Sequence, residues 1–248
     1  MCLYSLRVVI KLKIQVIGSG SMWNEYNSAC YLIDNDIMVD FPNGACKYLY
    51  RSGKMPKDIN HVLLTHFHGD HYFDIPFYIL NKSKSKSHTI NIYCSKDGKK
   101  KINKLGYLAF PNSFKDALKE TNIDYTFNKD FAINNYKISK LLVDHGRMKP
   151  AYGYIFKTDN KIVGFTGDTT LCSNVEYMAS ICDMLFCDCM FKVATDKHMG
   201  INKLEHLANK YKNCKFVVSH LENDTRDILI KQKLKNVVVP KDGQIIEI

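Results

Sequence analysis

The sequence predicts an α/β (α+β) protein in which two β-sheets face each other and helices cover their outer faces, a four-layer αββα sandwich. Short apolar segments typical of strands alternate with helical patterns along the chain. This succession of strands and helices occurs in two similar halves. A chain of 248 residues is long enough for one large domain of this kind, in which the two apolar sheet faces bury each other.

The first half is expected to contribute five strands and two helices. The first strand ends in Gly18-Ser19-Gly20, and Asp34-Asn35-Asp36 marks the turn of a hairpin. Gly53 follows the first helix as a stop signal. The expected strands are 14–17, 29–33, 37–40, 61–64 and 90–94, and the expected helices are 44–51 and 73–80.

The second half repeats the pattern after a glycine-poor stretch that we expect to be compact. The expected strands are 136–143, 152–157, 161–165, 184–187, 216–218 and 237–239, and the expected helices are 175–182 and 202–211. The alternating Lys-Ser segment at 82–87 is expected to be a solvated loop. We expect a single domain over 1–248, with 1–12 as a poorly ordered extension.

The composition indicates a folded protein with a basic surface. Hydrophobic residues make up 46% of the chain and charged residues 24%, both normal for a globular protein. The formal net charge is +10, which favours a polyanionic partner, either nucleic acid or a small molecule that bears phosphate. The alternative is a lysine-rich composition without bearing on any site, because net charge alone does not locate one.

The nine cysteines are an odd number without a C-x-x-C pair, which favours reduced thiols and an intracellular, cytoplasmic protein. Cys187 and Cys189 lie in an apolar segment, where cysteine behaves as a small hydrophobe rather than as a metal ligand. The N-terminal apolar stretch is short and is broken by Arg7 and Lys11, so we expect no signal peptide. We expect no membrane-spanning helix either.

The central motif is His66-x-His68-x-Asp70-His71, which directly follows the expected strand at 61–64. Gly69 is expected to allow a tight turn, so that the first two histidines aim at one point and Asp70 and His71 at another. Imidazole and carboxylate groups suit zinc, and also manganese or iron. A histidine-rich surface loop is the alternative, and residues further along the chain decide between the two.

Three more apolar strands end in a potential metal ligand. These ends are Asp144-His145-Gly146, Gly167-Asp168-Thr169 and Ser219-His220. Each residue taken singly is more often an ordinary polar group at a strand end. Four such strand ends in one chain predict a metal site, because loops at the ends of buried strands are where a rigid scaffold presents functional groups.

With these motifs the sequence resembles the metallo-β-lactamase fold family from about Ile14 to Ile248. The resemblance implies two divalent metal ions, zinc or alternatively manganese or iron, with a hydroxide between them as nucleophile. A bridging carboxylate fits this picture, because its two oxygens can span metals about 3.5–4 Å apart. By that resemblance His66, His68 and His145 bind the first metal, Asp70, His71 and His220 bind the second, and Asp168 bridges the two.

Within that family the chain resembles ribonuclease Z and its phosphodiesterase relatives. The similar segments are Gly18-Ser19-Gly20-Ser21, Asn27-Ser28-Ala29, Gly164-Phe165-Thr166-Gly167-Asp168-Thr169 and Asp183-Met184-Leu185-Phe186-Cys187-Asp188. By this resemblance His198, which precedes the expected helix at 202–211, contacts the scissile phosphate and protonates the leaving oxygen. Asp70 is expected to share in catalysis. The alternative for His198 is a surface histidine beside a helix.

Two departures from ribonuclease Z bear on the substrate. Met199-Gly200 stands where that enzyme has Ser-Thr or Ala-Thr, and no long Gly/Pro-rich insertion resembles its transfer-RNA-gripping arm. Small relatives without the arm hydrolyse cyclic nucleotides, among them phage enzymes that destroy cyclic-nucleotide defence signals. We therefore expect a metal-dependent phosphodiesterase that acts on a small nucleotide or RNA, and on a cyclic nucleotide in particular.

The alternatives are a ribonuclease Z-type endoribonuclease acting on transfer-RNA 3′ ends, a lactonase or thioesterase, and a non-catalytic metal-binding relative. The basic charge and the His198 segment argue against the lactonase or thioesterase, and the intact ligand set argues against loss of catalysis. By resemblance we also expect a homodimer.

Overall fold

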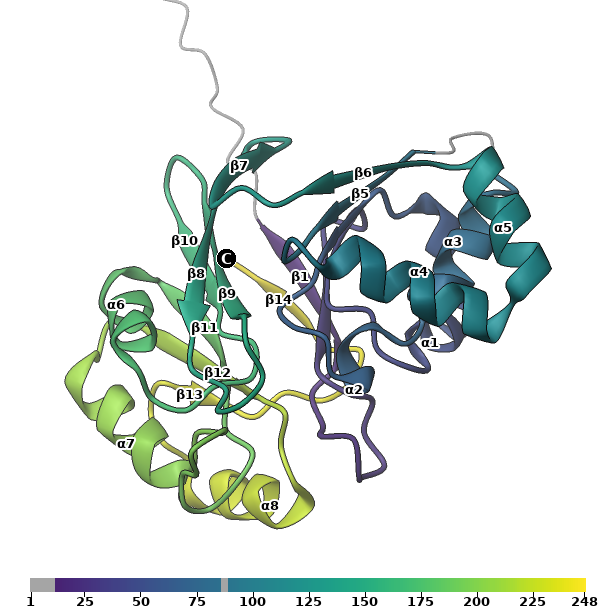
Figure 1. Cartoon of the computed structure of the whole chain (residues 1–248). Coiled ribbons are helices and arrows are strands. Elements are labelled where there is room, and N and C mark those ends of the chain that lie inside the picture. Colours follow the sequence, from purple (N-terminus) through teal and green to yellow (C-terminus); the bar gives the residue numbers. More distant parts are fainter. Residues whose placement is uncertain (1–11, 86–88) are drawn as a thin grey trace, which may run out of the picture.

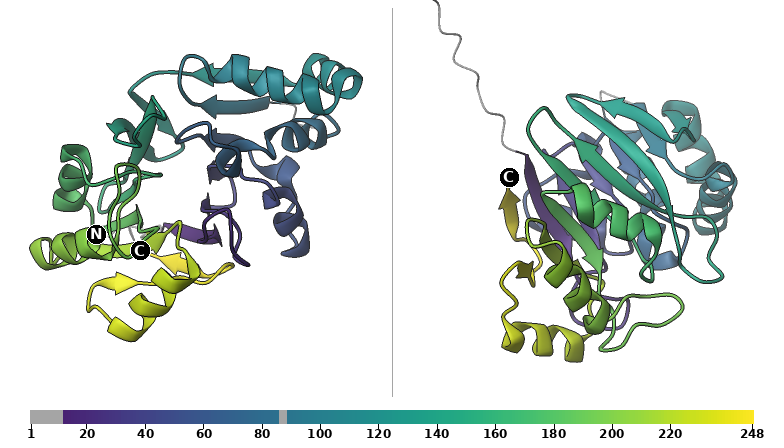
Figure 2. Two further views of the ribbon diagram at one scale, coloured as in Figure 1. Left: turned by 60° about the horizontal axis from the view of Figure 1, so that its bottom comes forward. Right: turned by 90° about the vertical axis from the view of Figure 1, so that its left-hand side faces the viewer.

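The computed structural model describes residues 12–85 and 89–248 and confirms the predicted fold class. Two seven-stranded sheets face each other, and helices lie on the outer face of each (Figure 1). Helices of the first half of the chain cover one sheet, and helices of the second half cover the other (Figure 2). No helix within these residues is both long and apolar enough to cross a bilayer.

The first sheet has the strand order β14-β1-β2-β3-β4-β5-β6. Its strands are β1 (Lys13–Gly18), β2 (Cys30–Ile33), β3 (Ile37–Val39), β4 (His61–Leu63), β5 (Thr89–Tyr93), β6 (Asn122–Thr126) and β14 (Ile245–Glu247). Strands β3, β4, β5 and β6 run parallel, so their carboxyl ends meet at one edge of the sheet.

The second sheet has the order β13-β12-β11-β10-β9-β8-β7. Its strands are β7 (Asp130–Ile133), β8 (Tyr136–Val143), β9 (Ala151–Lys157), β10 (Ile162–Phe165), β11 (Met184–Asp188), β12 (Lys215–Ser219) and β13 (Val237–Val238). Strands β10 to β13 are parallel. Ligands of α/β proteins bind beyond the carboxyl ends of such strands.

The helices are α1 (Ala45–Arg51), α2 (Gly69–Tyr72), α3 (Ile75–Lys82), α4 (Gly98–Ala109), α5 (Pro111–Glu120), α6 (Ser173–Ile181), α7 (Ile201–Lys210) and α8 (Asn223–Gln232), and Pro56–Asp58 is a 3₁₀ turn. Buried apolar residues form three clusters, one under each helical layer and one between the sheets. In the central cluster Tyr31 of the first sheet contacts Phe165 and Phe186 of the second, with ring centroids 5.1 and 4.8 Å apart. These aromatic contacts hold the two sheets together at the end that carries the site.

The predicted elements are present, with ends that differ by a few residues, but the sequence prediction omits several. The expected helix at 73–80 is wrong at its start, because Pro76 lies in the first turn of α3 and so begins a helix separate from α2. The segment expected only to be compact holds α4 and α5, and Pro111 begins α5. The other omitted elements are the 3₁₀ turn Pro56–Asp58, α2, β6, β7, α8 and β14.

The expected extension at 1–12 falls almost wholly outside the described residues. Its last residue, Leu12, is buried, and its backbone exchanges hydrogen bonds with Ile248. The expected solvated loop at 82–87 is wrong at its first residue, and its last two residues lie outside the described residues. Lys82 ends α3, and its side chain is only 1% exposed.

The buried Lys82 ammonium ties α3 to the turn before β4. It donates to the carbonyl oxygens of Lys57 and Ile59, at 2.8 and 3.0 Å, and to Asn60 Oδ1 at 2.6 Å. Burial lowers the pKa of this amine, and the three acceptors compensate the desolvation of its charge. The turn held in this way leads into the strand that carries the histidine motif.

Replacing Lys82 by methionine keeps the aliphatic stem but removes this donor from all three acceptors, of which the Ile59 carbonyl oxygen keeps a second donor, the Tyr78 hydroxyl. We expect Lys82→Met to lower the free energy of unfolding by about 2–4 kcal/mol, measured as a shift of the urea midpoint. The matched control is Lys84→Met, two residues on at an exposed position, which should stay within about 0.5 kcal/mol of the parent. Equal midpoints for the two variants would contradict the structural role of Lys82.

Candidate metal centre

The histidine motif lies in the loop after β4 and is fixed from behind by Asp40, which follows β3. Asp40 accepts hydrogen bonds from Thr65 N and Thr65 Oγ1, both at 2.8 Å. Its Oδ2 atom also lies 2.8 Å from Nδ1 of His71. One buried carboxylate therefore holds both the start and the end of the loop. Asp40 adopts a φ of 61°, an uncommon conformation for a non-glycine residue that is often found at functional sites.

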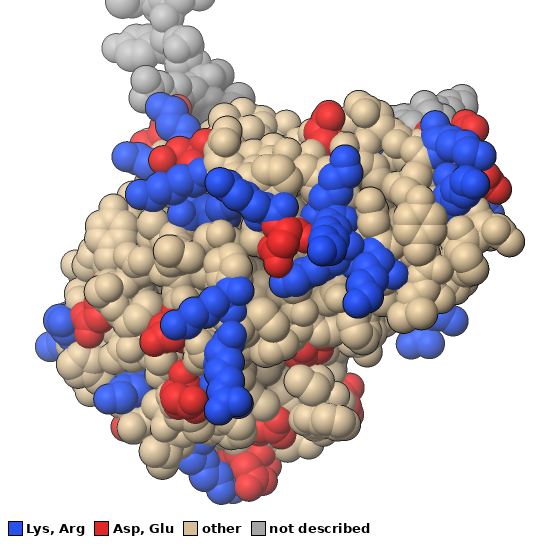
Figure 3. Space-filling model, viewed as in Figure 1, with Lys and Arg blue, Asp and Glu red and all other residues tan. Residues whose placement is uncertain are grey.

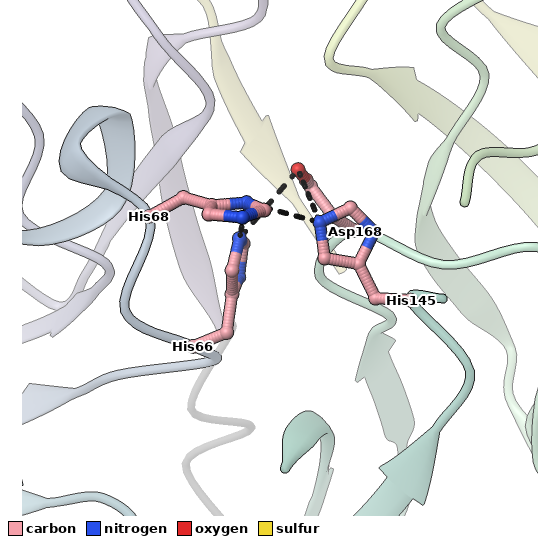
Figure 4. A group of neighbouring side chains, drawn as sticks. All are labelled: His66, His68, His145 and Asp168. Atoms are coloured by element: carbon pink, nitrogen blue, oxygen red, sulfur yellow. Dashed lines mark hydrogen bonds and ion pairs between the residues drawn. The ribbon is translucent and has the colours of Figure 1, made fainter. Parts of the chain in front are cut away.

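The first cluster consists of His66, His68, His145 and Asp168, whose potential ligand atoms all lie within 4.8 Å of one another (Figure 4). Nδ1 of His68 is 3.1 Å from Nε2 of His66 and 3.1 Å from Nε2 of His145. The other ring nitrogens of these two histidines are held from outside the cluster. Nδ1 of His66 lies 3.0 Å from Thr65 Oγ1, and Nδ1 of His145 lies 2.9 Å from the carbonyl oxygen of Lys197.

The second cluster consists of Asp70, His71 and His220, whose ligand atoms also lie within 4.8 Å of one another. Asp70 Oδ2 is 3.3 Å from Nε2 of His220 and 3.7 Å from Nε2 of His71. All three residues are buried. His220 has a φ of 57°. Like Asp40, this candidate ligand therefore adopts a strained backbone conformation.

Asp168 lies between the two clusters. Its Oδ2 atom is 3.2 Å from Nε2 of both His71 and His220, and 3.8 and 3.9 Å from Nε2 of His66 and His145. The preceding Gly167 has a φ of 61°, and a Cβ there would lie 2.8 Å from Cβ of Thr65. A glycine is therefore required to bring Asp168 up to the histidine loop.

Burial and neighbouring charges set protonation states that suit metal binding at the first cluster. Burial lowers the pKa of His68 and His145, and burial together with His71 lowers the pKa of His66 well below its usual range. Burial opposes ionisation of Asp168, but His220 and His71 outweigh it and hold its pKa well below normal. Neutral imidazoles and an ionised carboxylate are the forms that bind metal.

The two histidines of the second cluster are protonated when no metal is bound. Burial opposes a charge on His71 and His220, but Asp168 outweighs it in both cases. The pKa of His71 rises well above its usual range, and that of His220 rises to about 9. A metal ion entering this cluster must therefore displace protons.

His198 lies beside both clusters and is oriented by Asp188 at the end of β11. Its Nδ1 atom is 2.8 Å from Asp188 Oδ2, and its ring stacks on that of His220 with centroids 5.1 Å apart. Burial lowers the pKa of His198, but the bond to Asp188 outweighs this and raises it. Asp168, His198 and His220 also form a third group whose ligand atoms lie within 4.8 Å of one another.

The residues present fit two metal ions. Three imidazoles and a carboxylate converge in the first cluster, and two imidazoles and a carboxylate in the second, which are donor sets that zinc accepts. Nε2 of His71 is buried and makes no hydrogen bond within the described residues, although Nδ1 of the same ring is bound to Asp40. An imidazole oriented by a carboxylate on one nitrogen and open on the other is typical of metal ligands.

The structure brings together the seven predicted ligands and His198, but two points differ from the sequence analysis. Gly69 does not make a left-handed turn. It begins α2, and a Cβ there would lie 2.6 Å from the ring of Phe73, so close packing is what requires glycine. Asp40 was missed as a functional residue, although an aspartate directly after an apolar strand is the same signal that identified Asp168. Cys187 and Cys189 lie in the outer apolar cluster and in neither metal-binding group.

Comparison with known proteins identifies the family. A family model described as "Anti-Pycsar protein Apyc1" matches residues 12–243. Ribonuclease Z of Pyrococcus furiosus is 29% identical over 129 residues, which cover 50% of this chain and 39% of that protein. The match thus spans about two fifths of that relative's length.

Solved structures share the fold at low identity. YhfI, a metallo-β-lactamase fold protein from Bacillus subtilis, superposes with a TM-score of 0.78 at 19% identity and covers 96% of this chain and 100% of its own. A diphosphatase of the PhnP family superposes with a TM-score of 0.74 at 17% identity, over 96% of this chain and 98% of its own. The fold, the clustered histidines and aspartates and the family match agree: the chain has the metallo-β-lactamase fold and belongs to the anti-Pycsar protein Apyc1 family.

Proposed function

We propose that this chain is a two-metal phosphodiesterase that hydrolyses a small nucleotide phosphodiester, and a cyclic nucleotide in particular. The observation that carries the proposal is the position of Asp168 Oδ2 between two ligand clusters, with His198 beside both. Two cations held side by side match the two oxygens of a phosphodiester that change charge, the attacking one and the leaving one.

In this proposal zinc is the native metal, with manganese and iron as alternatives. His66, His68 and His145 would hold one ion, Asp70, His71 and His220 would hold the other, and Asp168, which lies between the clusters, would be shared by both. When bound, the pair of ions polarises the phosphoryl group and supplies a nucleophile at neutral pH. Asp40, Thr65 and the carbonyl group of Lys197 orient the imidazoles through the nitrogens that face away from the ions.

His198 is the proposed general acid. Its Nδ1 atom is engaged by Asp188, which leaves Nε2 for the substrate. The raised pKa favours the protonated ring, which can give a proton to the oxygen that leaves phosphorus. Asp188 acts through His198 as a positioning residue, since it fixes both the ring orientation and the tautomer. Asp70 would contribute to catalysis as one of the three residues that hold the second ion.

Two observations support a small substrate, and a third supports an anionic one. The family match is to the anti-Pycsar protein Apyc1, which favours the small relatives that hydrolyse cyclic nucleotides over ribonuclease Z. The segment between β5 and β6 folds into the compact helices α4 and α5. Lys and Arg side chains are spread over the face of the molecule shown in Figure 3, and the net charge of +10 favours an anionic substrate. A ribonuclease Z-type activity is the second candidate, favoured by the likeness to ribonuclease Z of Pyrococcus furiosus.

The experiment that separates these two candidates compares substrates. We expect the metal-loaded protein to hydrolyse at least one 3′,5′-cyclic mononucleotide with a higher kcat/KM than it cleaves the 3′ end of a precursor transfer RNA. Product chromatography and gel analysis give the two rates on one preparation. Efficient 3′-end cleavage without turnover of any cyclic mononucleotide would reverse the order of the two candidates.

The purified protein should bind two transition-metal ions per chain, measured by elemental analysis after reconstitution and dialysis. A metal ion that binds to the second cluster must displace the protons on His71 and His220, because Asp168 raises the pKa of both histidines. These groups are protonated below their raised pKa values, so affinity there should weaken as the pH falls below about 9, the pKa of His220. No more than one tightly held ion at any pH would contradict the two-cluster assignment.

Replacing His198 should impair the chemical step without loss of metal. General acid catalysis is worth roughly 10²–10⁴-fold in rate, so His198→Ala should lose about that factor in kcat on a cyclic nucleotide. The loss should be smaller on bis-p-nitrophenyl phosphate, because its leaving group needs no proton. The control is His206→Ala, which removes an exposed histidine paired with Glu176 on the helical layer.

Two results would contradict this role of His198. Loss of one metal ion from His198→Ala would make it a ligand, which the third group of Asp168, His198 and His220 allows. Full activity on both substrates would show that His198 has only a structural role, through its hydrogen bond to Asp188.

A further inference from the structure

The loop between β1 and β2, residues 19–29, lies at the same edge of the first sheet as the metal clusters. β3 and β4 run parallel, and the histidine motif follows β4. β2 is antiparallel to β3, and β1 is antiparallel to β2. The end of β1 and the start of β2 therefore meet at the edge where β3 and β4 end. This loop, here called the rim loop, borders the site.

The rim loop is bonded directly to the segment that carries His220. Leu221 N donates to the carbonyl oxygen of Ser19 at 3.1 Å, and Ser21 N donates to that of Leu221 at 3.2 Å. The side chain of Asn24 also donates to the Leu221 carbonyl oxygen, at 2.6 Å. Because Leu221 directly follows His220, these bonds fix the loop relative to the second cluster.

A second set of contacts fixes the loop from behind. The guanidinium of Arg226 lies 3.7 Å from the centroid of the Tyr26 ring, and its NH2 group donates to Ser19 Oγ at 2.9 Å. Asp242 accepts hydrogen bonds from Ser19 Oγ at 3.0 Å and from Asn27 N at 2.7 Å. Arg226 is buried, so this attachment belongs to the folded core rather than to a solvated surface.

Within this fixed loop, two large apolar side chains face solvent. Trp23 is 80% exposed and Met22 47% exposed, while the backbone N–H of Trp23 is held by Ser21 Oγ at 3.3 Å. An indole with so little buried surface contributes little to folding. On either side of Trp23 in the sequence, Ser21 and Asn24 are bonded to Leu221, the residue after His220. An exposed indole on a loop held in this way is pre-organised for binding a flat group.

We propose that Trp23 is the base-stacking residue of this site and so sets the preference for nucleotides over simple phosphodiesters. The inference rests on the proposed function, since it takes the substrate to be a nucleotide whose phosphate lies at the metal clusters. The indole presents its face to the nucleobase while the phosphate is held by the ions. Stacking on an aromatic ring tolerates different bases, because every base has a π-face.

Trp23 is the only tryptophan of the chain, so its fluorescence reports on this loop alone. The test titrates metal-loaded protein with adenosine 5′-monophosphate, uridine 5′-monophosphate and ribose 5-phosphate, and equilibrium dialysis measures binding independently. We expect saturable quenching by the two nucleotides and none by the base-free sugar phosphate. Bound nucleotide without a change in emission would overturn the proposal, as would equal quenching by ribose 5-phosphate.

Substitution tests the same point through kinetics. Trp23→Ala should raise KM for the cyclic nucleotide about 5- to 150-fold with kcat and metal content unchanged, which corresponds to about 1–3 kcal/mol of stacking at 1.36 kcal/mol per tenfold change. Trp23→Phe should recover most of the affinity, because it restores an aromatic face. The matched control is Leu108→Ala on α4, which removes another strongly exposed apolar side chain, 81% exposed, and should change neither constant.

The outcomes separate failure of this inference from failure of the proposed function. Turnover of a cyclic nucleotide by the parent with an unchanged KM in Trp23→Ala would overturn the inference alone. A fall in molecular mass by light scattering, again with unchanged KM, would assign Trp23 to a contact between two copies and would also overturn it. If the parent turns over no cyclic nucleotide, the proposed function fails, and the fluorescence titration still decides whether Trp23 binds a base.

Discussion

The Oδ2 atom of Asp168 has Nε2 atoms of four histidines within 3.9 Å, and all five residues are buried. Without metal this arrangement is held together by protons, because Asp168 keeps a charge on His71 and His220 while burial keeps His66 and His145 neutral. If neither protons nor metal ions lay between them, the lone pairs of these buried ligand atoms would repel each other. The surrounding loops and sheets hold these five side chains at these short distances.

Both sheets contribute loops that position these side chains. The first sheet supplies the histidine loop after β4, and the second supplies the Asp168 loop after β10 and the His220 loop after β12. The clusters therefore exist only while the sheets stay in register. The aromatic contacts of Tyr31 with Phe165 and Phe186 fix that register close to the site, and Tyr152 N donates to the Thr65 carbonyl oxygen across the gap at 2.9 Å. Core packing and ligand geometry are thus one constraint, and a shift of either sheet would separate the two clusters.

The ligands could be predicted from sequence because each follows a short apolar strand, and periodicity locates such strands well. α4 was missed because Lys99, Lys100 and Lys101 fill its first turn, so its apolar face shows only further along, at Ile102. Asp40 was not recognised as a functional residue, because an aspartate at the end of a hairpin strand is also an ordinary turn residue. Its role depends on the contact between β3 and β4, and the position of the buried Lys82 depends on contacts between residues 22 to 25 positions apart. Such contacts leave no periodic signal in the sequence.

The two sides of the site differ in what they offer a substrate. On one side, the segment after β11 brings His198, whose ring is held by Asp188 and stacked on His220, so this side carries a titratable group in a fixed orientation. On the other side, the rim loop is bonded to Leu221 and Asp242 and presents the side chains of Met22 and Trp23 to solvent. Both sides are anchored to the same short segment, His220-Leu221, which adopts a left-handed conformation at its first residue. A strained backbone at that point is understandable, because one peptide must direct an imidazole to the metals while its neighbour anchors the loop that faces the substrate.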